Sequence, residues 1–297
     1  MLTQQTAKQP KRLVVLGGSG FVGRHVAHLS RSRGVETLSL SSSDLNLAGD
    51  DAAQALSDIL HSDDVVLFCS AIDKGSKSGS DTLIQNVTMA HQVAKATRQT
   101  PITQLIYLSS DSVYPFGTGL TSEATPPSPT MLYGAMHLSR ELTLKVETDV
   151  PLAILRLTGI FGVGDAHQAY GPNRFLQQAL DGNPIKLFGQ GEEMRDHLYA
   201  PDVAAMIWQV IVQQETGTLN LATGQSISFY DIAKQLAGLA GSTIETTPRQ
   251  QAITHRHYDV TKRLKSLPSV TPTPLNVALK EIWAELTQNQ ANSASNA

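Results

Sequence analysis

Short apolar runs alternate with amphipathic stretches through the first half of the chain. Residues 13–16 and 65–69 are typical of buried strands, and residues 24–33 and 81–97 have the spacing of amphipathic helices. Strands that alternate with helices form a parallel sheet that is covered on both faces. We therefore predict an α/β fold with a doubly wound parallel sheet. Its strands are expected at residues 13–16, 35–40, 65–69, 104–109 and 153–157.

The alternation loosens after about residue 160. Loop-like, helical and short strand-like segments follow one another without a regular order, and this pattern favours a smaller second lobe. We expect a first domain at residues 11–165 with parts of 190–225, and a smaller, interleaved lobe at 166–286. Residues 1–10 and 288–297 are polar or rich in Asn, Ala and Ser, so we expect disordered tails there.

A glycine loop follows the first predicted strand. Gly17, Gly20 and Gly23 are spaced three residues apart, and a helical pattern comes directly after them. The first glycine permits a tight turn, the second lets a pyrophosphate approach the backbone, and the third allows close packing of helix on strand. The free N–H groups of the helix start, here at Phe21 and Val22, attract phosphates. This strand–turn–helix context predicts a dinucleotide site.

The end of the second predicted strand bears on the choice of dinucleotide. An acidic residue at this point would bind the adenosine ribose of NAD and repel the 2′-phosphate of NADP. Ser41 stands there, in a run of three serines, and Asp44 follows. Hydroxyl groups can donate to a phosphate, so the sequence favours NADP and leaves NAD open.

Composition excludes several other classes of protein. The chain has 297 residues and a net charge of −3, so no basic surface for nucleic acid is expected. No apolar stretch approaches the roughly 20 residues of a membrane span. The single cysteine, Cys69, lies in an apolar run and is interpreted as a buried thiol. The polar start of the chain lacks the apolar core of a signal peptide, and we expect a cytoplasmic protein without a membrane partner.

Two further segments bring the chain close to a known family. Residues 107–114 read Tyr-Leu-Ser-Ser-Asp-Ser-Val-Tyr, and residues 133–137 read Tyr-Gly-Ala-Met-His. With the glycine loop before them, they make residues 11–286 resemble the extended short-chain dehydrogenases/reductases, more narrowly the nucleotide-sugar epimerases, dehydratases and reductases. The resemblance implies a Rossmann sheet, a smaller C-terminal α/β lobe for a nucleotide-sugar substrate, and a homodimer.

The resemblance assigns the catalytic groups. Ser110 matches the family's catalytic hydroxyl, which holds the reacting oxygen of the substrate. Tyr133 matches the tyrosine that passes a proton to or from that oxygen while hydride moves at the nicotinamide. Dehydratases of the family have two acidic residues after the hydroxyl, and here Asp111 and Ser112 stand in the substrate-binding positions. Only Asp111 matches, which weakens a dehydratase reading.

His137 departs from the family pattern. Relatives have a lysine four residues after the tyrosine, one helical turn away on the same face. That lysine binds the nicotinamide ribose and lowers the pKa of the tyrosine. An imidazole is shorter, and with an ordinary pKa of about 6.5 it is mostly neutral at pH 7. A weaker field on Tyr133 favours reduction, which needs a protonated phenol, over oxidation, which needs a base.

The remaining site residues are also implied by the resemblance. Asp44 and Leu45 match a pair beside the adenine, Ser70 and Ala71 match the turn that lines the cofactor, and Asn86 matches a residue that supports the active-site backbone. Tyr133 and His137 are expected at the cofactor as well as at the substrate. The expected substrate-binding side chains beyond Asp111 and Ser112 are Thr158, Asn173, Arg174, Arg195 and Arg256.

Three functions fit these expectations. The first is NADPH-linked reduction of a 4-keto nucleotide sugar, with Tyr133 as proton donor. The second is an NAD-dependent nucleotide-sugar 4-epimerase, which would keep its cofactor bound. The third is a dinucleotide-binding sensor with little or no catalysis, which the replacement of lysine by His137 would permit. No metal is expected in any of them.

Overall fold

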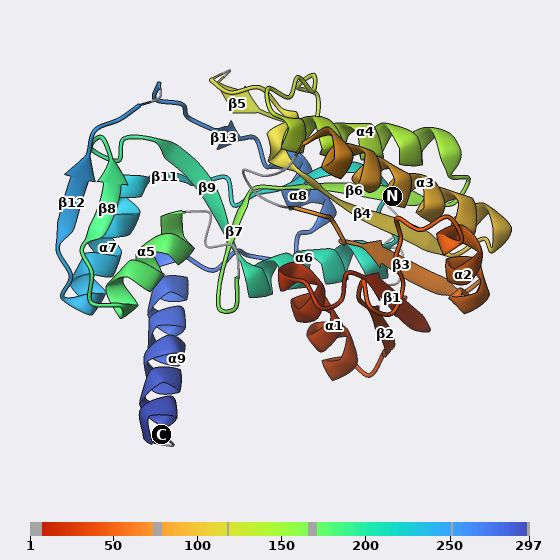
Figure 1. Cartoon of the computed structure of the whole chain (residues 1–297), viewed down its shortest axis with the longest axis horizontal. Coiled ribbons are helices and arrows are strands. Elements are labelled where there is room, and N and C mark those ends of the chain that lie inside the picture. The colour runs from red at the N-terminus through yellow and green to blue at the C-terminus, as the bar shows by residue number, and fades with distance from the viewer. Residues whose placement is uncertain (1–7, 74–78, 118, 166–170, 251, 296–297) are drawn as a thin grey trace.

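A six-stranded parallel sheet forms the centre of the molecule (Figure 1). The computed structural model describes residues 8–73, 79–117, 119–165, 171–250 and 252–295. The strand order is β10-β6-β4-β3-β1-β2, and every neighbouring pair is parallel. The predicted α/β fold with a doubly wound parallel sheet is therefore confirmed. The strands are β1 (Arg12–Leu16), β2 (Glu36–Leu40), β3 (Asp64–Phe68), β4 (Gln104–Ser110), β6 (Leu152–Leu157) and β10 (Gly217–Leu221).

Helices cover both faces of this sheet. Side chains of α1 (Phe21–Ser32) and α6 (Ala200–Gln213) share one apolar core with the sheet. Those of α2 (Ala52–Ile59), α3 (Ser80–Gln99) and α4 (Leu132–Glu147) share the core on the opposite face. Because both faces are buried, β3 and β4 consist of buried residues throughout. This explains why the strands have continuous apolar runs instead of alternation.

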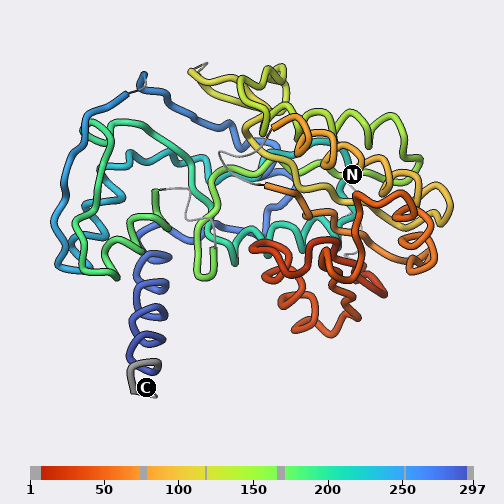
Figure 2. The backbone as a smooth tube through the Cα atoms, in the orientation of Figure 1, coloured from red at the N-terminus to blue at the C-terminus, as the bar shows by residue number. Residues whose placement is uncertain are grey.

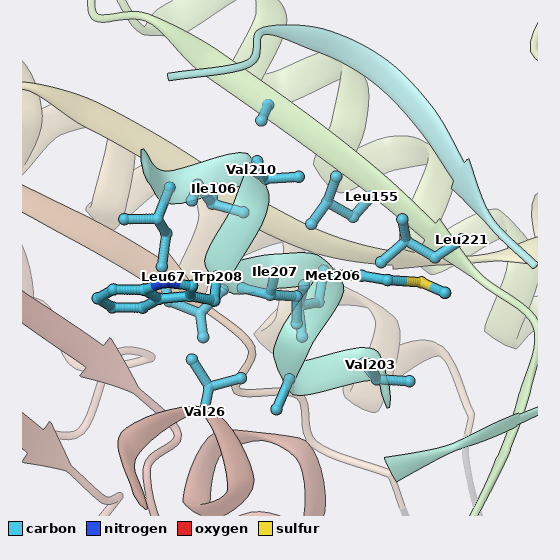
Figure 3. Packing of buried hydrophobic residues seen from close by; sticks show 14 of the residues in the cluster. Val26, Leu67, Ile106, Leu155, Val203, Met206, Ile207, Trp208, Val210 and Leu221 are labelled. Atoms are coloured by element: carbon cyan, nitrogen blue, oxygen red, sulfur yellow. The ribbon is translucent and has the colours of Figure 1, made fainter. Parts of the chain in front are cut away.

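Helix α6 is the clearest example of this packing. Val203, Ile207 and Val210 of this helix belong to the same apolar core as Leu67 and Ile106 of the sheet, and Figure 3 shows Ile207 and Val210 among the side chains of the strands. All five residues are 0% exposed. Burying such a side chain stabilises the fold by roughly 1.5–3 kcal/mol. Strand β10 thus belongs to the central sheet and α6 packs on it, although both follow the first elements of the second lobe in the sequence.

The second lobe is built from short strands and three helices. Its apolar core joins α5 (Gly171–Leu180), α7 (Phe229–Ala240) and α9 (Leu275–Ser295). Its strands form a sheet of order β11-β9-β7 and two pairs, β12-β8 and β13-β5. They are β5 (Leu120–Thr121), β7 (Gly159–Phe161), β8 (Ile185–Phe188), β9 (Met194–Tyr199), β11 (Ser226–Ser228), β12 (Ile244–Thr247) and β13 (His257–Tyr258), and the short helix α8 (Thr261–Ser266) precedes the Pro-rich stretch. Pair β13-β5 links this lobe to the loop after β4.

The end of the chain differs from the expected disordered tail. Helix α9 continues to Ser295, so residues 288–295 are helical, and Figure 2 shows the end of this helix leaving the body of the molecule. The first turns of α9 are anchored by the buried side chains of Leu279 and Ile282, and a helix once started adds residues at little cost. None of the helices in the described part of the chain has an apolar stretch long enough to cross a membrane.

Candidate active site

The glycine loop packs tightly between β1 and α1. Gly17 has a φ of +97°, and its N–H donates to the carbonyl of Leu40 at 2.8 Å. A Cβ atom on Gly23 would lie 2.2 Å from the carbonyl oxygen of Gly17, so no larger residue fits without movement. Gly20 precedes the first helical residue, Phe21, and Val22 follows it. The loop therefore has the close helix-on-strand packing and free helix start that a dinucleotide site requires.

A cavity of about 70 Å³ opens beside this loop, at the carboxyl ends of the first three strands. Parallel sheets bind ligands at this edge. The cavity brings together four of the residues that the sequence assigns to the cofactor: Gly17, Ser41, Leu45 and Ser70. Leu16, Leu40, Ser42, Asn46, Leu47, Ile72 and Met89 complete its lining, and Ala71 lies in the same turn as Ser70.

Asp44 is hydrogen-bonded to Ser41 at the end of β2, where the adenosine end of a dinucleotide is expected. Its carboxylate accepts from the Ser41 N–H at 2.8 Å and from the Ser41 hydroxyl at 2.6 Å. These bonds hold the pKa of Asp44 below its ordinary value, with the hydroxyl as the larger cause. Arg24 of α1 donates to the carbonyls of Val163 and Gly164. The end of β2 therefore carries a fixed negative charge at Asp44.

The catalytic hydroxyl lies where β4 ends. Ser110 is the last residue of the strand and the cap of a 3₁₀ turn, Asp111–Val113; its Oγ accepts from the Ser112 N–H at 3.1 Å. Helix α4 begins two residues before Gly134, and a Cβ atom on Gly134 would lie 2.1 Å from the carbonyl oxygen of Ser112. The first turn of α4 therefore packs directly on this turn. That contact packs the first turn of α4, which carries Tyr133, against the turn that follows Ser110.

His137 is buried beneath Tyr133. The two rings are nearly perpendicular, with centroids 4.7 Å apart, and the Nδ1 atom of His137 lies 2.8 Å from the Tyr107 hydroxyl. The Nε2 atom is buried and has no hydrogen-bond partner among the described residues. Burial, and then the charge of Arg140, lowers the pKa of His137 to about 3. The imidazole is therefore neutral at pH 7 and faces the protein interior.

Asn86 and Arg140 support the turn after β3 from below. The Asn86 amide accepts from the Ile72 N–H at 3.0 Å and donates to the Ile72 carbonyl at 2.8 Å, which fits the supporting role expected of it. Arg140 donates to the Asn86 side chain at 3.2 Å and to the Ser70 carbonyl at 2.8 Å. Sequence reasoning missed Arg140. The available signal was its place seven residues after Tyr133, two helical turns along the same face of α4.

Asp111 forms a closed cluster with the second lobe. Its carboxylate accepts from the Tyr258 hydroxyl at 2.5 Å and lies 3.2 Å from the Arg256 guanidinium. Arg256 also donates to the carbonyls of Asp111 and Tyr114. The structure thus brings together two expected substrate residues, Asp111 and Arg256, as partners of each other.

Arg195 contacts the same aromatic ring as Arg256 of this cluster. The guanidinium carbons of Arg195 and Arg256 lie 5.4 and 4.1 Å from the Phe116 ring centroid. Arg195 donates to the Thr254 carbonyl at 2.5 Å and to its hydroxyl at 2.7 Å. It also borders a cavity of about 350 Å³, which is lined further by His197, Thr223, Gln225, Ile227, Arg263, Leu264, Pro268 and residues 270–275. Two cations therefore converge where the lobes meet.

The other expected substrate residues hold the second lobe together. The Thr158 hydroxyl donates to Asp196 at 3.3 Å, and Thr158 is 5% exposed. Asn173 accepts from the Gly162 N–H at 3.0 Å. Arg174 is separate from both, with its guanidinium carbon 5.1 Å from the Phe188 ring centroid. The contacts of these three side chains are structural ones within the lobe.

A glycine loop at β1, a hydroxyl at the end of β4 and a tyrosine at the start of α4 define an α/β oxidoreductase that uses a nicotinamide dinucleotide. The chain belongs to the NAD-dependent epimerase/dehydratase family, whose model matches residues 13–222.

Individual relatives are distant. A trifunctional UDP-glucose 4,6-dehydratase/UDP-4-keto-6-deoxy-D-glucose 3,5-epimerase/UDP-4-keto-L-rhamnose-reductase of Arabidopsis thaliana is 24% identical over 96% of this chain and 48% of the relative. The chain thus spans about half the length of that protein. Among solved structures, MoeE5 in complex with UDP-glucose and NAD matches with a TM-score of 0.82 and 22% identity, over 94% of this chain and 99% of that one. UDP-N-acetylglucosamine 4-epimerase from Bacillus cereus matches with a TM-score of 0.79 and 21% identity, over 93% and 96%. These likenesses establish the Rossmann fold.

Proposed function

We propose that the chain reduces a 4-keto nucleotide sugar with NADH. Hydride passes from the nicotinamide to the carbonyl carbon, and the Tyr133 hydroxyl gives its proton to the carbonyl oxygen. Ser110 donates a hydrogen bond to the same oxygen and holds it near the nicotinamide. The observation that supports this most is the packing of the first turn of α4, which carries Tyr133, on the 3₁₀ turn that follows Ser110.

The buried position of His137 favours a reductase over an epimerase. An epimerase keeps its NAD through both half-reactions, whereas a reductase must release NAD⁺ and bind NADH in every turnover. The lysine of relatives binds the nicotinamide ribose, but His137 directs one nitrogen to Tyr107 and buries the other. Loss of that charged hydrogen bond weakens the hold on the cofactor. An exchangeable cofactor suits reduction.

The choice of NADH over NADPH rests on Asp44. Its carboxylate stands at Ser41, where an adenosine 2′-phosphate would lie, and the bonds from Ser41 keep it ionised. Two negative charges at such a distance repel each other. The same carboxylate can accept from the 2′-hydroxyl of NADH.

Dehydration fits the cluster at Asp111 poorly. A dehydratase needs a free acid beside the sugar to protonate the departing hydroxyl. Asp111 is held by Arg256 and by the Tyr258 hydroxyl, and Ser112 replaces the second acid. An ion-paired carboxylate is a poor proton donor.

The test is a substrate assay with purified protein, NADH and UDP-4-keto-6-deoxy-D-glucose, a keto sugar named among the activities of the plant relative. We expect one NADH to be oxidised for each sugar reduced, and Tyr133→Phe and Ser110→Ala to abolish most of this turnover. Keto sugar that is left unreduced by wild-type protein with NADH, and with NADPH, would refute the proposal.

A 4-epimerase is the second candidate, because the Asp44 site suits NAD and an epimerase uses that cofactor. Its signature is purified protein that retains NAD and interconverts a nucleotide sugar without net use of cofactor. UDP-N-acetylglucosamine, the sugar named for the neighbour from Bacillus cereus, is the probe. Conversion of this sugar by the untreated protein would favour the epimerase over the reductase.

A homodimer is also proposed. Ile84 of α3 and Leu142 and Val146 of α4 are 62%, 53% and 83% exposed, and the two helices lie side by side on one face of the molecule (Figure 1). Exposed apolar side chains on neighbouring helices are typical of a protein contact. Sedimentation of the purified chain tests this: a monomer at micromolar concentration contradicts it.

A further inference from the structure

Arg140 is the largest side chain that is fully buried in the described structure. It lies on α4, on the face that also presents Tyr133 and His137. Its guanidinium carbon is 4.3 Å from the Phe68 ring centroid and 4.9 Å from the Tyr107 ring centroid. The charge is therefore enclosed by aromatic rings at the ends of β3 and β4, directly beneath the turn that lines the cofactor cavity.

No carboxylate accompanies this charge. Arg140 takes part in no ion pair within the described residues, and its acceptors are the Ser70 carbonyl and the Asn86 amide. The adjacent acid, Glu141, is bound to Arg156 at 2.6 and 2.9 Å instead. Burying a cation without an anion is costly, so structural arginines are normally paired. An unpaired one beside a candidate active site calls for a functional reason.

A chain of contacts joins Arg140 to Tyr133. The Arg140 guanidinium lies over the Tyr107 ring, the Tyr107 hydroxyl lies 2.8 Å from His137, and the His137 ring packs on Tyr133. Burial lowers the pKa of Arg140, and the hydroxyls of Tyr107 and Tyr133 and the thiol of Cys69 act against this change. Burial raises the pKa of Tyr107 and also that of Cys69, the latter to about 12, so both remain protonated. Tyr133 is only half-buried. It is therefore the member of this group that a substrate can reach and deprotonate.

We propose that Arg140 supplies the positive charge that stabilises the phenolate of Tyr133, in place of the lysine that relatives have at position 137. When Tyr133 gives its proton to the substrate oxygen, the O–H bond breaks and the negative charge stays on the phenol. Arg140 lowers the energy of that state without touching the substrate, and water then returns the proton. Arg140 is thus a positioning residue, and its role rests on the proposed function only through the proton transfer by Tyr133.

The arrangement separates two tasks that one lysine performs in relatives. Arg140 provides the positive charge from within the protein interior. His137 makes no hydrogen bond to the nicotinamide ribose, because one of its ring nitrogens is directed to Tyr107 and the other is buried. Arg140 also fixes the Ser70 carbonyl, so the cofactor turn and the proton donor share one support. This predicts a catalytically competent tyrosine together with a loosely held cofactor.

The experiment measures the ionisation of Tyr133 directly, without substrate. The tyrosinate absorbance of each protein is titrated, and the curve of the same protein with Tyr133→Phe is subtracted. The other titratable or charged groups around Tyr133 are His137, which packs on its ring, Arg140 of the same helix, and Tyr107 and Asp111 of the elements against which α4 packs. All except Arg140 are left unchanged in the first comparison.

Arg140→Met is expected to raise the apparent pKa of Tyr133, by at most about 1–3 units, which is the effect of losing an adjacent opposite charge. Arg140→Lys is expected to retain most of the wild-type value. Lys145→Met is the matched control, because it removes one positive charge from the exposed side of the same helix. It should leave the titration unchanged.

A double variant keeps the proposal testable if Arg140→Met folds poorly. His137→Lys with Arg140→Met returns the charge to the family's position and is expected to bring the titration of Tyr133 back toward that of the wild type. If Tyr133 titrates alike in wild type, Arg140→Met and Arg140→Lys, the proposal is overturned. A shifted titration in a protein that reduces no keto sugar would support the role of Arg140 and refute the assigned substrate instead, so the two failures can be told apart.

Discussion

The two ends of the cofactor groove follow the family pattern to different degrees. At the adenosine end, Gly17 and Gly23 pack as the spacing requires, and Asp44 places an acid at the end of β2. At the nicotinamide end, Tyr133 is present, but the positive charge has moved from position 137 to Arg140. Backbone geometry at the first end permits only glycine. A charge at the second end acts over several ångströms, so its source can move within the helix.

The largest expected effect is at the nicotinamide end. Tyr133→Phe removes the proton donor and keeps the ring that packs on His137. Turnover of keto sugar should fall about 10²–10⁴-fold, the usual contribution of a positioned general acid. NADH affinity, measured by calorimetry, should stay unchanged. Equal losses of both would mean that Tyr133 holds the cofactor and does not transfer the proton.

A glycine substitution tests the adenosine end. In Gly23→Ala the new Cβ atom would meet the Gly17 carbonyl at 2.2 Å, so the loop must move away from the phosphates. Overpacking of this kind costs about 1–3 kcal/mol, which corresponds to a loss of roughly 10–100-fold in NADH affinity. Gly34→Ala is a control outside the groove, since the space around it is open, although its φ of +77° adds some strain. Unchanged NADH affinity in Gly23→Ala would contradict the assignment of the loop.

A smaller effect is expected from Asp44→Asn. The amide keeps an acceptor for Ser41 and removes the charge at the end of β2. Affinity for NADPH relative to NADH should rise about fivefold, because a repulsion of roughly 1 kcal/mol is lost. Competition binding with the two dinucleotides measures this ratio. If wild-type protein already prefers NADPH, the role given to Asp44 is wrong.

The smallest effect concerns stability in mild acid. The unfolded chain protonates His137 near pH 6.5, and the folded chain does so only near pH 3, because the imidazole is buried. Between these values the unfolded state binds more protons, so the free energy of unfolding falls as the pH falls through this window. From pH 7 to 6 the loss is about 0.7 kcal/mol for one such histidine. Urea unfolding should show that His137→Gln removes this loss, whereas a substitution of the exposed His28 does not.

The sequence was informative wherever local spacing decides the structure. Three glycines between a strand and a helix, Ser110 at a strand end and Tyr133 at a helix start all follow from neighbouring residues, and the parallel sheet follows from the alternation. The cluster of Asp111 with Arg256 could not be read in this way, because 145 positions separate the two residues and only the tertiary fold joins them.

The direction in which side chains point was the second feature that could not be predicted from the sequence. Asp44 lies four residues past the strand end, and only the turn of the backbone brings its carboxylate back to Ser41. Arg140 has the place of an ordinary helix residue in the sequence, where an arginine suggests a solvated surface. Its burial depends on Phe68 and Tyr107, which two separate strands contribute. Helical periodicity placed it on the face of Tyr133 but gave no sign that this face was enclosed.

The central claim is that hydride moves between NADH and the sugar carbon beside Tyr133. NADH that bears deuterium on the transferred face of its nicotinamide tests it most directly, with UDP-4-keto-6-deoxy-D-glucose as acceptor and mass spectrometry of the product. We expect one deuterium on carbon 4 of the reduced sugar, and almost none with Tyr133→Phe over the same time. A reduced sugar without deuterium from labelled NADH of either face would contradict the account.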